Sequence, residues 1–226
     1  MKIRTENISK RYMRKSGEAN HFFAVKPVSL TLEEGRVTML SGRSGSGKTT
    51  LLHMLAGLLQ PTEGTIWLGE TDLYSLEDTA LSRLRNEKIG VIPQGRSAVE
   101  TLTVRENILL PGRLYGAEKP EAEQQAAEWM HRLGIEDLAD AWPVELSGGE
   151  LRRMAIARAL AARPEVLLAD EPTGDLDDEN TARVLMILRE EARRGAAVLL
   201  VTHEEDARSY ADALWRMNAG VLTMEA

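Results

Sequence analysis

Residues Arg36–Thr50 read RVTMLSGRSGSGKTT, a short apolar run that leads into a glycine-rich segment. Gly42–Thr49 match the spacing G-x-x-x-x-G-K-[ST], after a predicted strand and before a predicted helix whose apolar body starts at Leu51. Glycines allow a tight turn in which successive N–H groups face phosphate oxygens, and the following helix adds its positive end. The alternative is a plain flexible Gly/Ser turn. The strand, the spacing and the helix together favour a site for nucleotide phosphates.

The side chains of this loop predict which parts of a nucleotide it holds. Lys48 can bridge the β- and γ-phosphates, and the Thr49 hydroxyl can ligate Mg²⁺. The motif by itself does not separate a kinase, a GTPase and an ATPase. The predicted phosphate-binding residues are Gly42, Ser44, Gly45, Ser46, Gly47, Lys48, Thr49 and Thr50.

The apolar pattern around this loop predicts an α/β fold. Two segments before the loop, 2–9 and 21–35, have the alternation of half-buried antiparallel strands. Later in the chain, short apolar runs alternate with helical patterns, which indicates a mainly parallel sheet covered by helices. The further predicted strands are 36–40, 65–69, 89–93, 165–170, 196–203 and 213–218. The predicted helices are 51–59, 75–88 (apolar face Leu76, Ala80 and Leu84), 177–194 and 204–210.

The middle third of the chain has a different pattern. From about residue 95 to residue 163 the sequence is mostly helical and contains no convincing strand. We therefore expect a single domain over 1–226, with a nucleotide-binding core at 1–94 and 164–226 and an inserted helical subdomain at about 95–163.

Composition excludes several classes of function. The 226 residues carry a formal net charge of −7, which argues against a nucleic-acid partner, because such binding depends on lysine and arginine. The chain has no cysteine, so disulfides, thiolate catalysis and thiolate metal sites are excluded. The start of the chain lacks the apolar stretch of a signal peptide, and the apolar runs are too short to span a bilayer. We expect a soluble chain whose membrane role, if any, comes through a partner.

Two adjacent carboxylates end a predicted buried strand in VLLADEP, Val166–Pro172. The carboxyl ends of parallel strands are where such sheets bind ligands, so Asp170 is a candidate for holding magnesium. Glu171 could accept a proton from an attacking water. Adjacent side chains on a strand point to opposite faces, so both can reach one ligand only if the chain bends at the strand end. The alternative is an acidic start of a helix.

Three further polar residues stand at strand ends. His203 follows the buried strand of AAVLLVTH, on the edge where the phosphates are expected, and is a candidate contact for the γ-phosphate or the water. Gln94 ends IGVIPQ and could reach magnesium or water, although one glutamine is weak evidence. Tyr12 could stack on a base or could be an ordinary exposed aromatic. The other histidines, His21, His53 and His131, are expected to be surface or packing residues.

A second glycine motif, LSGGE, occupies Leu146–Glu150 (the signature segment) and leads into a predicted helix. Ser147 and Glu150 satisfy a capping box, which is the structural alternative. That box does not explain Gly148 and Gly149, which weaken a helix start by up to about 1 kcal/mol each relative to alanine. Exposed N–H groups at a helix start form an anion site. Because the chain already has a phosphate loop, we expect the signature segment to meet a phosphate held by a second copy.

With these motifs, GRSGSGKT, VIPQ, LSGGE, VLLADEP, TGDLD and VTH in this order, the sequence resembles the ATP-binding subunits of ABC transporters. The resemblance covers nearly the whole chain. Within that family, ADEPTGDLD and LTVRENILLPGRLYG (residues 102–116) look most like the group that serves macrolide export, lipoprotein release, antimicrobial-peptide resistance and cell division. Asp175 stands where that group usually has asparagine, and the residues around Gln94 also differ.

The resemblance implies a fold, a reaction and partners. It implies a phosphate-loop NTPase core with a β-rich N-terminal part and a helical subdomain that carries the signature segment. It implies hydrolysis of ATP with Mg²⁺, a head-to-tail dimer with itself or a paralogous ATPase, and a separately encoded membrane permease. The chain is then expected in the cytoplasm, peripheral on the inner face of the membrane, with the permease docked near Gln94–Thr103.

The resemblance also implies roles for particular residues. Tyr12 would stack on adenine, Gln94 would link the γ-phosphate to the membrane partner, and His203 would hold the γ-phosphate. Asp177 would cross the dimer interface, where Ser147–Glu150 of one subunit meet the ATP at Lys48 of the other. The implied catalytic residues are Glu171, His203, Lys48 and Gln94, the metal ligands Thr49, Gln94 and Asp170, and the trans ATP contacts Ser147, Gly148, Gly149 and Glu150.

Two other interpretations are open on the sequence. One is an ABC-type ATPase that acts as an assembly or regulatory factor without a transported substrate. A monomeric nucleoside kinase is disfavoured, because nothing in such an enzyme would need Ser147–Gly149.

Overall fold

The computed structural model describes residues 2–13, 21–95, 97–114 and 120–225. Arg96 of the expected docking region, and Tyr115 and Gly116 of the 102–116 stretch, therefore lie outside the described residues.

A six-stranded sheet forms the centre of the fold, in the order β11-β10-β4-β9-β8-β7. The strands from β10 to β7 are parallel, as the alternating pattern predicts, and β11 pairs antiparallel with β10. The pattern did not reveal β11, since this strand is short and largely exposed on both faces. The bounds are β4 Val37–Ser41, β7 Ile89–Ile92, β8 Val166–Asp170, β9 Ala197–Val201, β10 Ala213–Asn218 and β11 Val221–Met224.

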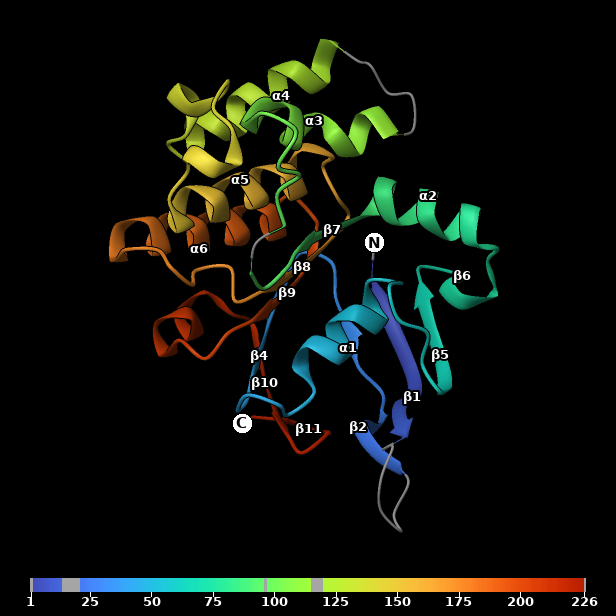
Figure 1. The fold of residues 1–226 in the computed structure, drawn as a ribbon. Helices are drawn as coiled ribbons and strands as arrows, with labels where there is room; N and C mark the ends of the chain where they lie inside the picture. Colours follow the sequence, from blue (N-terminus) through green and yellow to red (C-terminus); the bar gives the residue numbers. More distant parts are fainter. Residues whose placement is uncertain (1, 14–20, 96, 115–119, 226) are drawn as a thin grey trace.

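The N-terminal part of the chain forms a separate antiparallel sheet, as predicted. Its order is β2-β1-β5-β6, and β3 pairs with β1 off this path. The sheet lies at the lower right in Figure 1, and α1 lies between it and the central strands. The bounds are β1 Ile3–Met13, β2 His21–Val28, β3 Thr31–Leu32, β5 Glu63–Leu68 and β6 Thr71–Asp72.

Both faces of the central sheet are buried, which explains why its strands read as continuous apolar runs. In β8, Leu167 and Ala169 pack with the helices α3–α6 and their connections. The alternate residues Val166 and Leu168 pack with α1 and the antiparallel sheet. The loop between β4 and α1 therefore starts from a rigid base.

The helices agree with the predicted ones in position but not at every boundary. They are α1 Lys48–Leu55, α2 Asp78–Lys88, α3 Val104–Leu114, α4 Pro120–Arg132, α5 Gly148–Ala161 and α6 Asp178–Arg193, with 3₁₀ turns η1 Leu73–Ser75, η2 Glu136–Leu138, η3 Pro143–Glu145 and η4 Glu205–Tyr210. The helix predicted over 51–59 ends at Leu55, because Gly57 takes φ 69° and the amides of Leu58 and Leu59 turn back to the His53 carbonyl.

Two further expectations are corrected. The predicted apolar face of 75–88 was partly wrong: Leu81 is the buried residue of α2 and packs near Gly57, whereas Ala80 is exposed. The helix predicted at 204–210 is the 3₁₀ turn η4, which buries only Ala207 and so has no apolar face to hold a full α-helix.

Residues 97–163 contribute helices and no strand within the described part of the chain. The three helices α3, α4 and α5 pack on one another and gather above β7–β9 in Figure 1. We call this group the helical insertion. Its signature segment lies at the start of α5.

Candidate active site

The loop between β4 and α1 is packed tightly against two other strands. Gly47 takes φ 108°, and a Cβ there would lie 2.1 Å from the Ala24 carbonyl oxygen of β2. At Gly42 a Cβ would lie 2.3 Å from the Met217 carbonyl oxygen of β10. Only glycine fits such approaches, so these two positions fix the shape of the loop. The Lys48 ammonium donates to the carbonyls of Gly42 and Arg43, at 2.7 and 3.2 Å.

Thr49 and Asp170 meet at the start of α1. The Thr49 hydroxyl donates to Asp170 Oδ2 at 2.7 Å, which joins residues that are 121 positions apart. Asp170 is only 2% exposed. Burial raises the pKa of this carboxyl, and the charge of Glu171 acts in the same direction, whereas the bond from Thr49 opposes the shift.

The main chain bends at Glu171, as required for two adjacent carboxylates to reach one ligand. Glu171 takes φ 48°, a left-handed conformation that is uncommon for a residue with a side chain. Its N–H still bonds to the Val201 carbonyl at 2.8 Å, so the bend lies directly at the strand end. The Glu171 carboxylate accepts from His203 Nδ1 at 2.9 Å. This hydrogen bond and the charge of Glu171 raise the pKa of His203.

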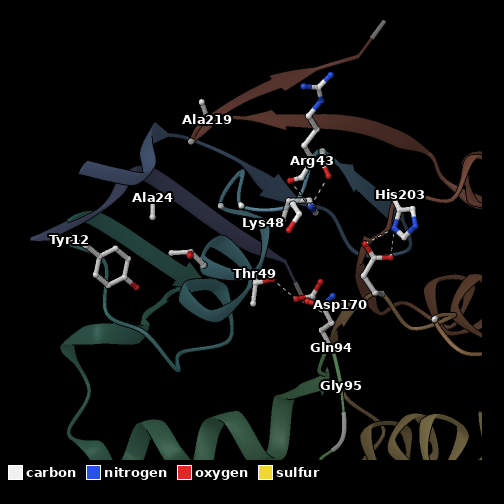
Figure 2. A pocket seen from close by; sticks show the side chains of 18 of the residues that line it. Tyr12, Ala24, Arg43, Lys48, Thr49, Gln94, Gly95, Asp170, His203 and Ala219 are labelled. Atoms are coloured by element: carbon white, nitrogen blue, oxygen red, sulfur yellow. Dashed lines mark hydrogen bonds and ion pairs between the residues drawn. The ribbon is translucent and has the colours of Figure 1, made fainter. Parts of the chain in front are cut away.

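A cavity of about 1150 Å³ connects these groups, which is ample for a nucleotide. Figure 2 shows Lys48, Thr49, Gln94, Asp170 and His203 around it, with Tyr12 at the far end. The predicted residues that line it are Tyr12, Gly42, Ser44, Gly45, Gly47, Lys48, Thr49, Thr50, Gln94, Asp170, Glu171 and His203.

The end of this cavity near Tyr12 is aromatic. Tyr12 stacks on Phe22 with ring centroids 5.8 Å apart, and the Lys10 ammonium lies 5.6 Å from the Tyr12 ring. Phe22 and Phe23 line the cavity as well. A flat apolar surface of this kind can stack on a nucleobase.

Ser46 does not line the cavity, although it belongs to the predicted loop residues. Its N–H bonds to the Arg43 carbonyl, and its side chain is buried beside Gly42 with no hydrogen-bond partner for the hydroxyl among the described atoms. Its side chain therefore contacts the loop rather than the cavity.

The signature segment lies in an adjoining hollow of about 590 Å³, lined by Ser147, Gly148, Gly149 and Asp177. Its capping box is present: the Ser147 hydroxyl caps the Glu150 N–H, and the Glu150 carboxylate accepts from the Ser147 N–H at 2.7 Å. Glu150 is thus used within α5 and does not line the hollow. We call this surface the signature hollow.

Gly148 and Asp177 differ in whether they have a structural role within the chain. A Cβ at Gly148 would meet nothing closer than 3.7 Å, an ordinary contact with Asp175. Nothing in the chain's own packing therefore requires glycine at this position. Asp177 caps α6 by accepting from the Asn180 N–H at 2.8 Å, and these bonds to Asn180 lower the pKa of its carboxyl.

Several lining residues were not predicted. Asp175, Gly95 and Arg152 line both the large cavity and the signature hollow. The signal for Arg152 in the sequence is slight: it is one arginine in a helix that is buried on nearly all sides. Its place in the site follows from the packing of α5 against the core.

The oxygen atoms at this site suit Mg²⁺, which needs few protein ligands, better than a metal ion that is held entirely by protein side chains. Among the described residues, no group of three or more His, Cys, Asp or Glu could hold a metal ion. Magnesium is usually held by one or two protein oxygens together with phosphates and water. The adjacent Thr49 hydroxyl and Asp170 carboxylate supply such oxygens, and Gln94 lines the same cavity.

None of the helices within the described ranges is both long enough and apolar enough to cross a membrane. Residues 25–174 match the model of the family described as ABC transporter. The ABC transporter ATP-binding protein YtrE of Bacillus subtilis is 36% identical over 209 residues, which cover 92% of this chain and 90% of that protein. The lipoprotein-releasing system ATP-binding protein LolD of Aquifex aeolicus is 37% identical over 223 residues, which cover 99% of this chain and 96% of that protein.

A solved structure of an ATP-binding cassette is also similar to this chain. The ATP-binding cassette MJ0796, in a dimeric post-hydrolysis state with bound ADP and Pi, superposes with a TM-score of 0.90 at 32% sequence identity. The superposition covers 98% of each chain.

Proposed function

The chain belongs to the ABC transporter family and is an ABC-type ATPase that binds ATP, and from this premise we propose that it powers a separate membrane permease. ATP joins two copies, or one copy and a paralogous ATPase, head to tail, and hydrolysis releases them. One observation carries the proposal: the Lys48 loop and the signature segment line different hollows of the same chain. A complete site then needs a second subunit.

The nucleotide lies along the large cavity. Its base stacks on Tyr12, and its phosphates lie against the loop N–H groups and the start of α1. Lys48 exchanges its bonds to the Gly42 and Arg43 carbonyls for phosphate oxygens. Thr49, Asp170 and Gln94 would hold Mg²⁺, which would neutralise charge on the phosphates.

Hydrolysis uses the residues at the strand ends. Glu171 accepts a proton from the attacking water, and its bond to His203 orients the carboxylate. The ring of His203, whose pKa is raised by its hydrogen bond to Glu171 and by the charge of Glu171, donates toward the γ-phosphate as charge develops there. Gln94, which lines the same cavity, positions the water.

The signature segment acts on ATP bound to the other subunit. The chain leaves room at Gly148 that its own packing does not need, which is consistent with close approach of a ligand from outside. The N–H groups at the start of α5 then face the phosphates. Ser147 and Gly149 border the same space, and Asp177 lies at its rim.

The permease docks in the cleft between the core, at 1–94 and 164–226, and the helical subdomain at about 95–163, near Gln94–Thr103. A mainly apolar hollow supports this position, lined from α2, β7, α3 and α5. Its exposed rim includes Leu58 and Leu114, which are 53% and 66% exposed. The docked subunit lies on the inner face of the membrane, and the Gln94 region beside it reports the state of the nucleotide.

A mixing experiment tests action in trans. Lys48→Ala protein lacks a phosphate contact but keeps its signature segment, whereas Gly148→Asp places a carboxylate where a phosphate must approach. Each mixed dimer has one site with both defects and one with neither. We expect each variant alone to be inactive and the mixture to regain ATPase activity. Gly148→Ala serves as a folding control, because the chain itself accommodates the methyl group.

A mixture that stays inactive, although both proteins are folded and shown to pair, would contradict independent action in trans. Co-purification from detergent-solubilised membranes tests the transport role. Recovery without any membrane protein would favour an ABC-type ATPase that acts as an assembly or regulatory factor.

A further inference from the structure

The described residues of the segment 93–103, which follows β7 and contains Gln94, are held by the helical insertion. The Arg152 guanidinium of α5 donates to the Pro93 carbonyl at 2.7 Å. The Arg158 guanidinium, also of α5, donates to the carbonyl and hydroxyl of Ser97 at 2.8 and 2.6 Å. Asn107 of α3 bonds to both the N–H and the carbonyl of Val99.

The core does not hold this segment in the same way. Leaving Arg96 aside, every side-chain hydrogen bond that joins 93–103 to another element comes from α3 or α5. Gly95 takes φ 88°, and an added Cβ there would meet nothing within 4 Å. The segment is therefore fixed to the helical insertion and is loosely packed beside Gln94.

Arg152 has a distinct place among these contacts. It is 7% exposed, and it lines both the nucleotide cavity and the signature hollow. Within the described ranges its guanidinium makes no ion pair, and its one hydrogen bond goes to Pro93. The Pro93 carbonyl belongs to the planar peptide group whose nitrogen is that of Gln94. A bond to this oxygen therefore fixes the orientation of the chain on entry to Gln94.

We propose that Arg152 is a positioning residue that ties Gln94 to the signature helix α5 of the same subunit. The position of α5, which presents the signature segment, thereby sets the position of Gln94 through the Arg152–Pro93 bond. This bond therefore links two events in one subunit. The signature segment contacts the second subunit's nucleotide, and Gln94 places the water in the subunit's own cavity. This inference rests on the proposed role of Gln94 in hydrolysis.

The test compares Arg152→Met, Arg152→Lys and a control, Arg105→Met. Methionine keeps most of the volume but cannot donate, whereas lysine can still reach the Pro93 carbonyl as a single cationic donor. Arg105 lies on α3, has a half-exposed side chain, and makes only ion pairs of 3.9 Å, which contribute little. If Arg152→Met does not fold, Arg152→Gln replaces it, since glutamine is uncharged and too short for the same reach.

Two measurements are made on the full chain. For ATPase activity we expect kcat of Arg152→Met to fall by about tenfold with KM for ATP nearly unchanged, the loss expected for a charge-assisted hydrogen bond. Arg152→Lys restores most of kcat. For backbone NMR order parameters without nucleotide, we expect those of the Gln94 and Gly95 amides to fall from about 0.85 to about 0.6 in Arg152→Met and not in Arg105→Met.

Unchanged order parameters at Gln94 and Gly95 in Arg152→Met would overturn the proposal. A raised KM with unchanged order parameters would show instead that Arg152 contacts the nucleotide directly. Failure of the proposed function is distinguishable, because the NMR measurement needs no ATPase activity. If Gln94→Ala hydrolyses ATP at the normal rate, Gln94 has no role in hydrolysis, and the order parameters alone decide whether Arg152 holds the segment.

Discussion

At Glu171 a single backbone angle decides how the site is assembled. A left-handed conformation in a residue with a side chain costs of order 1–3 kcal/mol, and such strain clusters at functional sites. Here φ 48° turns the carboxylate toward His203, while Asp170 remains in the strand and bonds to Thr49. Two neighbouring acids thus have different partners and can have different roles.

Glu171→Gln should keep ATP binding and lose hydrolysis, because an amide cannot accept the proton of the water. We expect single-turnover phosphate release to slow by at least about 100-fold, with nucleotide affinity retained. Glu190→Gln on the surface of α6 is the control. A normal rate of release in Glu171→Gln would show that another group accepts the proton.

The His203 ring should titrate above the ordinary histidine value, since Glu171 accepts its hydrogen bond and attracts its charge. A raised folded-state pKa contributes stability that is fully present below the unfolded pKa and lost as pH rises through the folded pKa. Titration followed by NMR of the ring should show the His203 pKa moving down toward about 6.5 in Glu171→Gln. An unchanged pKa in that variant would mean that the pair does not form in solution.

Lys48→Ala should reduce ATP turnover by about 100-fold or more, because the phosphates lose their cation. The fold should persist, since the Lys48 ammonium contacts only two carbonyls of its own loop. Steady-state ATPase assays and circular dichroism check both statements, with Lys26→Ala on exposed β2 as the control. Full activity in Lys48→Ala would refute the phosphate-loop assignment.

At the scale of elements, α3 holds the segment 93–103 through Asn107. Its side chain is 0% exposed and accepts from the Val99 N–H at 2.8 Å. Its amide group donates to the carbonyls of Val99, Leu102 and Thr103. One buried amide thus bonds to several backbone groups of a turn, in addition to the turn's own bond from the Leu102 N–H to the Val99 carbonyl.

Asn107→Ala should lower the free energy of unfolding by about 3 kcal/mol, because the Val99 N–H and the Leu102 carbonyl lose their bonds to a fully buried side chain. The control is Asn86→Ala, which removes one bond from a half-buried side chain to the Pro111 carbonyl and should cost about 1 kcal/mol. Urea unfolding of both variants gives the comparison. Equal losses would show that the Asn107 bonds are replaced by water.

At the scale of the whole molecule, the two halves of the proposed ATP site lie on one surface of the chain but in different hollows. The loop side is cationic at Lys48, and the hollow side presents the start of α5. Without nucleotide, two such polar surfaces have little to bury against each other, so association is expected to be weak. ATP with Mg²⁺ supplies charge that both surfaces can contact.

Dimerisation should therefore require nucleotide and should be strongest in Glu171→Gln, where ATP persists. Analytical ultracentrifugation with no nucleotide, with ADP and with ATP–Mg²⁺ measures this. Gly148→Asp in the Glu171→Gln background should remain monomeric, since a carboxylate would face the γ-phosphate. Equal dimerisation in all three conditions would contradict the proposed ATP-driven association.

The sequence by itself determined the family and the reaction. The motifs GRSGSGKT, LSGGE and VLLADEP are each local, because turns and strand ends within each motif position its polar side chains and N–H groups. The ABC ATPase assignment and the α/β fold with a mainly parallel sheet are confirmed. The roles assigned to individual residues and the division at 95–163 stay predictions. Local pattern also placed most helices and strands, since the apolar period depends only on neighbouring residues.

Only the tertiary structure decided which distant groups meet. The Glu171–His203 bond joins positions 32 apart, and the Arg152–Pro93 bond joins positions 59 apart. Such pairs depend on how α5 and β9 pack against β7 and β8, and no local period encodes that packing. For the same reason the sequence missed Arg152 and misjudged the apolar face of α2, because what a side chain contacts is set by the elements that cover it.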